Sequence, residues 1–357
     1  MGAFLNPIFW SGKKVLVTGH TGFKGGWLSL WLRELGAEVH GLSLPPEERS
    51  FYGATRLEEE VHDHFIDLRD EKAVSNMLSK LQPEAIFHFA AQAQVLEAYQ
   101  DPLRTISTNV MGTVHLLESA RHLRSLKAFV CVTTDKVYEN QDGGRAFAEE
   151  DRLGGSDPYA ASKTATEVLL RSYRESFFRQ QNSPVLVAVR SGNAIGGGDW
   201  GSQRLVPGLI RCLQGGEILN IRSKGATRPW QHVLEPLGGY LILVERICKS
   251  SQKISDAYNF GPSEDQQVSV EEMARIFSEI SGRQLALSFD SSKQKENLHL
   301  RLKSEKAEKE LAWVPRWTLR QAIQMTWDWY QAEANGVDMK TYSKMQIKSW
   351  KSCGLQD

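Results

Sequence analysis

Short apolar segments alternate with longer amphipathic segments through the first half of the chain, and this alternation restricts the fold more than any other feature of the sequence. A short apolar run is typical of a buried parallel strand, and apolar residues three or four apart are typical of a helix. Strands are expected at 15–18, 39–42, 64–66, 85–89, 129–133 and 185–189, and helices at 27–35, 71–81, 109–123 and 160–178. The alternation predicts an α/β fold with a doubly wound parallel sheet.

The pattern changes after Val189. Residues 190–232 are rich in Gly, Arg and Trp without steady periodicity, which predicts loops and short elements of a second lobe. A further strand is expected at 257–260 and helices at 270–280 and 321–330, with Trp327 and Trp329 in the core. We therefore expect a Rossmann-type domain over 1–189, to which segments near 230–257 return, and a smaller C-terminal α/β substrate-binding lobe that is formed mainly by 190–357.

The charge balance argues against a nucleic-acid or membrane partner. The 43 Lys and Arg residues equal the 43 Asp and Glu residues, so no global positive field attracts such polyanions. No segment has the length and apolarity of a membrane span or the features of a signal peptide. The four cysteines are widely spaced, and no His, Cys, Asp and Glu residues have metal-ligand spacing. We expect a cytoplasmic protein with a small-molecule substrate and no metal.

A glycine-rich segment directly follows the first expected strand and opens the first expected helix. Backbone amides at such a helix start bind phosphate, and glycines let a dinucleotide approach closely. The acid that usually holds the adenosine ribose is absent at the end of the second strand, at Ser43, which leaves NAD versus NADP open. The residues of this turn expected to hold the cofactor are Gly19, Thr21, Gly22, Phe23, Lys24 and Gly25.

Further cofactor contacts are expected where later strands end. Asp67 and Leu68 follow the third strand, and Asp67 could accept a hydrogen bond from the adenine amine; the alternative is a helix N-cap. Ala90, Ala91 and Gln92 put small residues where a dinucleotide would cross the sheet, and Asn109 opens a helix nearby.

Tyr159 and Lys163 lie four residues apart, so a helix places both on one face. Tyrosine loses its proton only at about pH 10, and a neighbouring ammonium favours the phenolate. Lys163 can supply that charge, so the pair is a candidate base. The alternative is an exposed helix that carries both residues incidentally.

Thr134, Asp135 and Lys136 close the fifth expected strand. The carboxyl ends of parallel strands are where open α/β sheets bind ligands. An ionisable acid and base side by side at this edge suit an elimination reaction. The alternative is an ion pair that caps the end of the strand.

In this order, the glycine turn, Ala90-Ala91-Gln92, Thr134 and the Tyr159/Lys163 pair resemble the extended short-chain dehydrogenase/reductase family. Within that family the chain is similar to the nucleotide-sugar 4,6-dehydratases. Relatives specific for dTDP-glucose and GDP-mannose carry Thr-Asp-Glu at the catalytic strand, whereas Lys136 here suits the CDP-sugar branch. The segments that carry this likeness are 19–27, 133–138, 190–193, 196–200 and 228–233.

The resemblance implies an enzyme that removes water from CDP-glucose with the help of bound NAD. Tyr159 would take the proton of the sugar 4-hydroxyl, Thr134 would hold that oxygen, and Lys163 would lower the pKa of Tyr159 and hold the nicotinamide ribose. Asp135 would then act as the acid that protonates the departing 6-hydroxyl, and Lys136 as the base that removes the proton on carbon 5. Which of Asp135 and Lys136 has which role stays open, because the two groups can titrate as a unit.

The same resemblance implies contacts to the substrate diphosphate and nucleotide from the second lobe, and a homodimer built through the helices near Asn109 and Tyr159. A nucleotide-sugar 4-epimerase is an alternative that uses Thr134, Tyr159 and Lys163 without the acid/base pair. Two further alternatives are another nucleotide-sugar 4,6-dehydratase and a non-catalytic dinucleotide sensor. The candidate substrate residues are Asn193, Arg204, Arg228 and Arg301.

Overall fold

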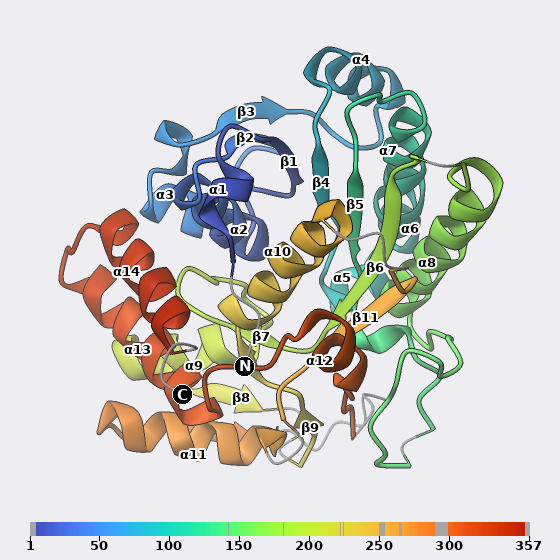
Figure 1. Ribbon diagram of the computed structural model, residues 1–357. Helices are drawn as coiled ribbons and strands as arrows, with labels where there is room; N and C mark the ends of the chain where they lie inside the picture. The colour runs from blue at the N-terminus through green and yellow to red at the C-terminus, as the bar shows by residue number, and fades with distance from the viewer. Residues whose placement is uncertain are drawn as a thin grey trace.

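A parallel sheet forms the centre of the molecule (Figure 1). The computed structural model describes residues 5–141, 143–180, 182–221, 223, 225–249, 254–263, 266–289 and 299–353, and the sheet within them has seven strands. These are β1 (Lys14–Thr18), β2 (Glu38–Ser43), β3 (His62–Phe65), β4 (Ala85–His88), β5 (Ala128–Val132), β6 (Val185–Ser191) and β11 (Ala257–Phe260).

The strand order is β11-β6-β5-β4-β1-β2-β3, with all pairs parallel. The direction of winding reverses between β1 and β4, and ligands of doubly wound sheets bind at the carboxyl ends beside such a reversal. The expected doubly wound α/β fold is confirmed.

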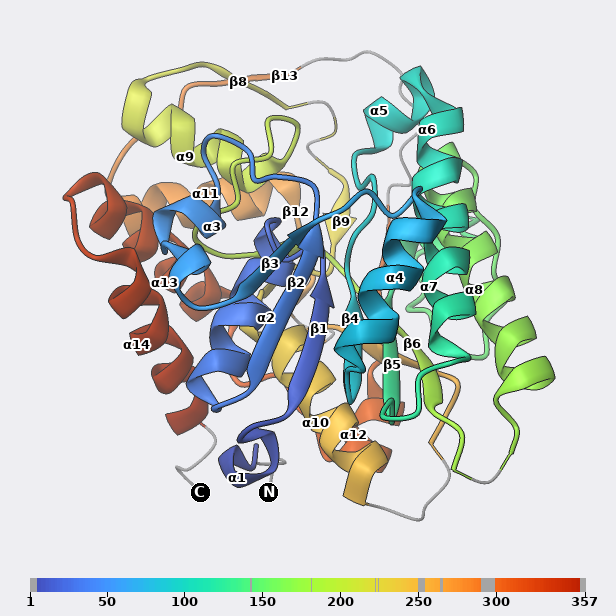
Figure 2. The ribbon, with the colours of Figure 1, turned by 90° about the horizontal axis from the view of Figure 1, so that it is seen from above.

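Two hydrophobic cores cover the two faces of this sheet. Val15 and Val17 of β1 pack into one core with α2 (Phe23–Glu34) and α10 (Leu234–Lys249). Leu16 between them packs into the other with α4 (Glu71–Leu81), α7 (Gly112–Ala120) and α8 (Pro158–Phe177), and Figure 2 shows these three helices along one side of the sheet. Each such side chain, fully buried, stabilises the fold by about 1.5–3 kcal/mol.

Two expectations about the elements need correction. The strand at β3 is not a buried one: it lies at the edge of the sheet with one neighbouring strand, and His62 and Phe65 are exposed. The helix expected at 109–123 is preceded by α6 (Pro102–Ile106) and a π-helical turn, η2 (Ser107–Met111). Asn109 lies inside this turn, and such turns often mark functional sites.

The residues after β6 form a second layer of short sheets and helices beside the main sheet. The strands pair as β7 (Ala194–Ile195) with β10 (Gln231–His232), β9 (Thr227–Arg228) with β12 (Val268–Ser269), and β8 (Leu219–Ile221) with β13 (Leu287–Phe289). Its helices are α9 (Leu205–Gly215), α11 (Val270–Ser281), α13 (Leu319–Ala334) and α14 (Met339–Ser352). Short elements elsewhere are α1 (Pro7–Trp10), α3 (Phe51–Ala54), η1 (Leu57–Glu59), α5 (Val95–Gln100), η3 (Asp135–Val137) and α12 (Glu305–Leu311).

Aromatic residues join this second lobe to the sheet. Trp27 of α2 donates a hydrogen bond of 2.9 Å from Nε1 to the Gly197 carbonyl, and Trp31 packs edge-on against Trp350 of α14. Trp327 and Trp329 are buried in the core, as expected. The two lobes therefore share one hydrophobic interior.

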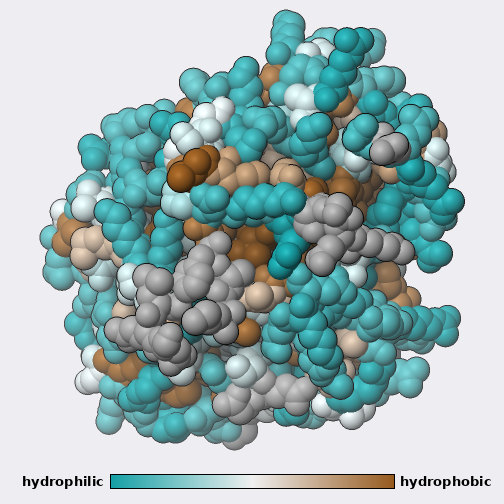
Figure 3. Space-filling view, viewed as in Figure 1, coloured by the Kyte–Doolittle hydropathy of each residue, from teal (hydrophilic) through white to brown (hydrophobic). Residues whose placement is uncertain are grey.

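Hydrophilic residues dominate the face of the molecule in Figure 3, with hydrophobic residues gathered near its centre. Among the described residues, no helix has both the length and the apolar character needed to cross a bilayer.

Candidate active site

The carboxyl end of β5 leads directly into the tight turn η3, which places ionisable groups at the carboxyl ends of the parallel strands. Thr134 caps this turn, because its Oγ1 accepts a hydrogen bond of 3.3 Å from the Lys136 amide. The same hydroxyl lies 3.0 Å from Asp135 Oδ1, to which it donates. Thr134 and Asp135 are buried, whereas Lys136 is half-buried.

The start of α8 brings Tyr159 to this turn. Asp157 caps the helix by accepting a hydrogen bond of 2.9 Å from the Ala160 amide, and Pro158 suits the first helical position. Tyr159 therefore lies in the first turn of α8, where its side chain is hydrogen-bonded with Thr134. Lys163, one turn further along α8, is buried and donates from Nζ to the Val132 carbonyl at 3.1 Å.

Burial dominates the ionisation of Tyr159. Burial raises the pKa of Tyr159 to about 12, while its hydrogen bond with Thr134 acts in the opposite direction. Burial also lowers the pKa of Lys163. In the protein without ligands, desolvation of the phenol dominates and Lys163 binds the end of β5, so the lowering of the Tyr159 pKa by Lys163 stays a prediction.

Burial shifts the ionisation of Asp135 in the direction that an acid needs. Burial raises the pKa of its carboxyl group, and the nearby charges of Lys136, Arg228 and Lys24 oppose this only in part. Its Oδ2 atom is buried without a hydrogen-bond partner among the described residues. A carboxyl group that keeps its proton and has an unused oxygen can donate that proton to a ligand.

Lys24 belongs to this centre as well as to the glycine turn. Its Nζ donates a hydrogen bond of 3.2 Å to Ser191 Oγ, and burial lowers its pKa to about 8. The charges of Arg204 and Lys163 lower that pKa further, and Asp135 acts in the opposite direction. The sequence assigned Lys24 to the cofactor alone, since its distance from Asp135 depends on how α2 packs beside the end of β5.

The glycine turn has the geometry needed to accept a dinucleotide phosphate. Gly19 has a φ of +74°, and a Cβ there would come within 2.8 Å of the Ala90 amide nitrogen. A Cβ on Gly25 would lie 2.2 Å from the Gly19 carbonyl oxygen. Gly22 is the N-cap of α2, and no described side chain caps this helix end, so amides of its first turn are available to a phosphate.

Hydrogen bonds to the end of β2 hold the glycine turn in place. Thr21 Oγ1 lies 2.9 Å from Ser43 Oγ and donates to the Leu44 carbonyl at 3.1 Å. Phe23 forms the first turn of α2. Ser43 and Leu44 thus lie at the end of β2, where many dinucleotide-binding sheets have an acidic residue that binds the adenosine ribose.

Asn109 connects two parts of the site. Its side chain accepts a hydrogen bond of 2.7 Å from the Gln92 amide, and it donates to the Gln92 carbonyl and to Ser162 Oγ, both at 2.9 Å. Ala90 donates to Thr18 Oγ1 at 3.1 Å. Because the polar atoms of its side chain are engaged, Asn109 positions the loop of Ala90, Ala91 and Gln92 against α8, and a direct contact to the cofactor stays a prediction.

Asp67 lies beside Arg69 at the end of β3. The two side chains form an ion pair of 2.5 Å, which lowers the pKa of Asp67. The N-cap of α4 is Asp70, so the alternative that Asp67 caps this helix is wrong. Leu68 is buried, and its carbonyl lies 2.8 Å from His115 Nδ1.

Three of the four candidate substrate-binding residues are arginines of the second lobe. Arg204 forms two contacts of 2.9 Å to the carboxylate of Asp199, and its charge acts on Tyr159 and Lys24. Arg228 is buried on β9 and its charge acts on Asp135. Arg301 follows a bridge between His299 and Thr227, and its buried Nε has no partner in the described part of the chain.

Asn193 is half-buried, and its carbonyl accepts a hydrogen bond of 3.1 Å from the Gln231 amide. His232 and Trp230 are packed in the interior. The structure thus brings Thr134, Asp135, Tyr159 and Lys24 together, with Arg204 and Arg228 beside them.

A buried polar network under the catalytic strand was missed by sequence reasoning. Glu167 of α8 accepts a hydrogen bond of 2.6 Å from Thr133 Oγ1 and contacts of 2.5–3.2 Å from Arg190 of β6. Arg190 also donates to Tyr138 Oη at 2.7 Å, and Tyr138 donates to Asn259 Oδ1 at 2.7 Å. One signal was available: Glu167 follows Tyr159 and Lys163 at further steps of four on α8.

The wound parallel sheet, the uncapped glycine turn and the buried tyrosine and lysine of α8 define the class of extended short-chain dehydrogenases/reductases. The chain belongs to the family described as GDP-mannose 4,6 dehydratase, whose model matches residues 16–326.

One relative is similar over nearly the whole chain. The CDP-glucose 4,6-dehydratase of Salmonella typhimurium is 40% identical over 350 residues, which are 96% of this chain and 98% of that protein. The sequence identity to this relative is higher than that to the solved structures described next, which are 19% and 21% identical.

Solved structures share the fold. The dTDP-glucose 4,6-dehydratase of Bacillus anthracis in complex with NAD has a TM-score of 0.76 at 19% identity, covering 92% of this chain and 100% of that one. The UDP-glucose 4-epimerase of Bifidobacterium longum in complex with NAD+ and UDP has a TM-score of 0.79 at 21% identity, covering 91% and 100%. Dehydratases and epimerases thus share this fold, and the fold does not separate the two reactions.

Proposed function

We propose that this chain is an NAD-dependent CDP-glucose 4,6-dehydratase, which converts CDP-D-glucose into CDP-4-dehydro-6-deoxy-D-glucose. The observation that carries this proposal is the buried Asp135, whose pKa is raised by burial and whose free oxygen lies at the turn that also holds Tyr159. The likeness to the Salmonella typhimurium CDP-glucose 4,6-dehydratase supports the choice of substrate.

The cofactor that this reaction needs is NAD. Bound NAD would supply hydride chemistry, as acceptor of the hydride from sugar carbon 4 and donor of it to carbon 6. The glycine turn is positioned to hold the pyrophosphate, Asp67 and Leu68 to border the adenine, and Lys163 to hold the nicotinamide ribose. Ala90, Ala91 and Gln92 border the path between them, with Asn109 as their support.

The first task of the protein is to move a proton. Tyr159, as phenolate, takes the proton of the 4-hydroxyl, and Thr134 holds that oxygen by a hydrogen bond. Because burial raises the pKa of Tyr159, this step needs positive charge beside the phenol. Lys163 and Arg204 are the protein groups that can provide it, and the charge of Arg204 already favours the phenolate.

The second task is elimination of water. The 4-ketone acidifies the proton on carbon 5, Lys136 acts as the base that removes that proton, and Asp135 gives its own proton to the departing 6-hydroxyl. A proton returns to carbon 5 when the hydride reaches carbon 6. Asp135 and Lys136 are adjacent in the turn η3 and can titrate as a unit, so their roles are best tested by separate substitution.

The second lobe is proposed to hold the nucleotide diphosphate. Arg204, Arg228 and Arg301 present guanidinium groups, which bind phosphate oxygens in a bidentate manner, and Asn193 borders them. This corresponds to a cofactor domain over residues 1–189, with α10 and β11 packed on its sheet, and a nucleotide-sugar lobe over 190–357.

An epimerase is the second candidate, because the fold is shared with UDP-glucose 4-epimerases. It would use Thr134, Tyr159 and Lys163 but has no need of a proton donor at Asp135. Incubation of the purified protein with NAD and CDP-glucose deuterated at carbon 4, in ordinary water, separates the two. A dehydratase yields a product lighter by one water with deuterium on carbon 6. A product of unchanged mass, or unchanged CDP-glucose together with turnover of dTDP-glucose, contradicts the proposal.

We also infer a homodimer, formed through the helices near Asn109 and Tyr159. Large apolar side chains are exposed on this side of the molecule, on α6, η2 and α8: Leu103, Ile106, Met111 and Val168. Exposed apolar residues gathered on neighbouring helices are typical of an interface. Sedimentation equilibrium tests this: Leu103→Glu should convert a dimer into a monomer, whereas Val337→Glu, an exposed position after α13, should leave it intact.

The cytoplasm is the proposed site of action, and the product would supply deoxysugars for surface polysaccharide such as O-antigen. All four cysteines lie in described segments and are free thiols, which suits a reducing compartment.

A further inference from the structure

Three histidines and a glutamate lie together at the edge of the main sheet, outside the site described above. Glu38 and His40 are on β2, and His62 and His64 are on β3. The two strands are parallel and pair His40 with His62 and Leu42 with His64. Because alternate residues of a strand point to the same face, all four side chains share one face of the sheet.

The donor atoms of this cluster are close enough to bind one ion. One ligand atom each from Glu38, His40 and His62 lies within 4.8 Å of the other two, and His40 Nε2 is 2.9 Å from Glu38 Oε1. A zinc ion binds nitrogen and oxygen ligands at about 2.0–2.2 Å, so neighbouring ligands lie roughly 3–4 Å apart. The rings of His40 and His62 have centroids 4.7 Å apart, and His62 is exposed, so a change of its rotamer completes the geometry.

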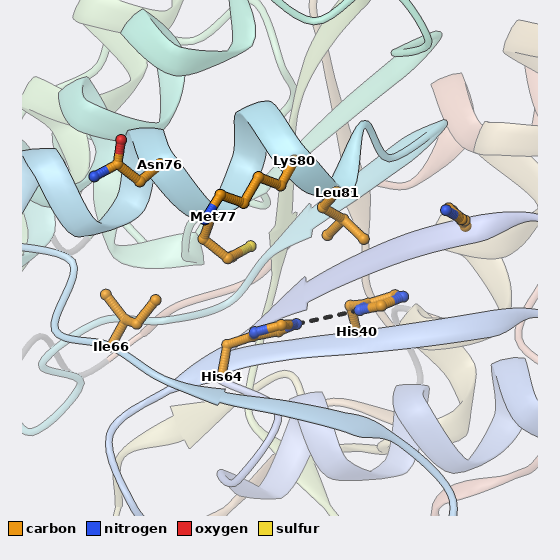
Figure 4. Close-up of a pocket in the computed structure, with 8 residues that line it drawn as sticks. His40, His64, Ile66, Asn76, Met77, Lys80 and Leu81 are labelled. Carbon is orange, nitrogen blue, oxygen red and sulfur yellow. Dashed lines mark hydrogen bonds between the residues drawn. The ribbon is translucent and has the colours of Figure 1, made fainter.

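His64 supports the orientation of His40. His40 Nδ1 lies 3.2 Å from His64 Nε2, as the dashed line in Figure 4 marks, where the two rings point toward each other from adjacent strands. A contact through one ring nitrogen directs the other nitrogen of His40 toward Glu38. Metal-binding histidines typically have such a second partner, which fixes the ring and its tautomer.

We propose that Glu38, His40 and His62 form a binding site for a divalent transition-metal ion, with Zn2+ as the ion that best fits two imidazoles and one carboxylate. Water completes the coordination, and His64 orients His40. The ion joins the edge strand β3 to β2, and since it binds the folded chain it stabilises the sheet edge.

The position of the cluster separates it from the proposed reaction. Glu38 begins β2 and lies roughly 16 Å from Ser43 at about 3.3 Å per residue, whereas the glycine turn contacts the end of β2 at Gly41, Leu42 and Ser43. The ring of His20 in that turn packs over Gly41, which faces the opposite side of the sheet from His40. Lys14 and Lys80 border the adjoining cavity of about 490 Å³, together with His40 and His64. These ammonium groups oppose a cation, and the charge of Glu38 offsets them in part.

Titration of Zn2+ into the full-length protein, stripped with a chelator and followed by calorimetry, tests the site. We expect one ion per chain and a melting temperature that rises with bound Zn2+. His62→Gln, at an exposed position, and His40→Asn should both abolish this ion, and His64→Ala should weaken it by about 10- to 100-fold without a change of stoichiometry.

His122→Asn is the matched control, because His122 is exposed and lies 3.9 Å from Glu118 in another His–Glu pair, on α7. It should change nothing. Replacement by Co2+ provides a spectroscopic readout, in which d–d absorption should be lost in His62→Gln. Absence of saturable Zn2+ binding, binding unchanged in both His62→Gln and His40→Asn, or thiolate charge-transfer absorption from an exposed cysteine such as Cys248 would overturn the proposal.

Discussion

The two halves of α8 each carry a glutamate that is paired with an arginine, but the two pairs lie in opposite environments. In its first half, Glu167 is paired with Arg190 at 2.5 Å, with side chains only 5% and 4% exposed. In its second half, Glu175 is paired with Arg171 at 3.1 Å, with side chains 46% and 73% exposed. Both pairs join a glutamate of α8 to an arginine, but Arg190 comes from β6 of the sheet and Arg171 from α8 itself, so the difference comes from what each turn faces.

That difference decides what each pair does. The Glu167 pair also holds Thr133, the residue directly before Thr134 of the candidate site, and it connects α8 to β5 and β6. Breaking a buried ion pair leaves an uncompensated charge in a medium that solvates it poorly, whereas water replaces either member of an exposed pair. The inner half of α8 therefore sets the geometry of the site, and the outer half has no such effect.

The largest effect is expected at the catalytic end of the helix. Tyr159→Phe should lower kcat by about 10²- to 10⁴-fold, because the variant loses the group that moves the 4-hydroxyl proton. Turnover of CDP-glucose with added NAD measures this. Tyr173→Phe on the same helix, whose hydroxyl lies 3.2 Å from Glu118, is the control and should keep its activity. Equal activity of the two variants would remove Tyr159 from the mechanism.

The paired glutamates come next. Glu167→Gln should lower the free energy of unfolding by about 3–5 kcal/mol, since Arg190 keeps its charge in a buried place. Glu175→Gln should leave urea unfolding unchanged, because its partner is solvated. A similar loss in both variants would show that burial does not distinguish the two halves. If Glu167→Gln also lowers kcat while the protein is fully folded, the pair positions Thr133 as proposed.

The smallest effect is expected on the pH dependence of stability, at Asp135 in the turn η3 beside α8. Burial raises the pKa of Asp135 above its ordinary value of 3.8. The folded protein therefore holds this proton more tightly than the unfolded chain, and stability is lost as the pH rises through the folded pKa. Asp135→Asn should remove that loss, so the variant should be more stable than the wild type at high pH and equally stable below pH 3.8.

Urea unfolding of both proteins across this pH range measures the difference. Asp151→Asn is a control of opposite sign, because hydrogen bonding to Arg145 lowers the pKa of Asp151 and that contact is lost on substitution. If Asp135→Asn is less stable than the wild type at high pH, the carboxylate is stabilised by its neighbours and is a poor acid.

Much of the fold and part of the site could be predicted from local sequence. The strands of the sheet follow from apolar runs, since a strand buried on both faces needs such a run. The glycine turn and the four-residue spacing of Tyr159 and Lys163 are also local, because a turn or one helical face joins them. β3 was misread as buried, since a short segment does not reveal whether it has one neighbour or two.

Other features depended on segments that are distant in the sequence. The pairing of Glu167 with Arg190 and the approach of Lys24 to Asp135 arise only when α8 packs on β6 and α2 packs beside the end of β5. The histidines at the sheet edge lacked metal-ligand spacing because they belong to two strands.

The sequence by itself determined the wound α/β topology, the phosphate-binding turn and the residue types of the candidate catalytic centre, because these depend on propensity and on spacing along one element. The tertiary structure decided how those residues ionise and which distant groups they meet. Desolvation is a property of the surrounding packing, and it opposed the expected direction for Tyr159 while it supported that for Asp135. Spacing along a chain contains no information about burial by the rest of the molecule.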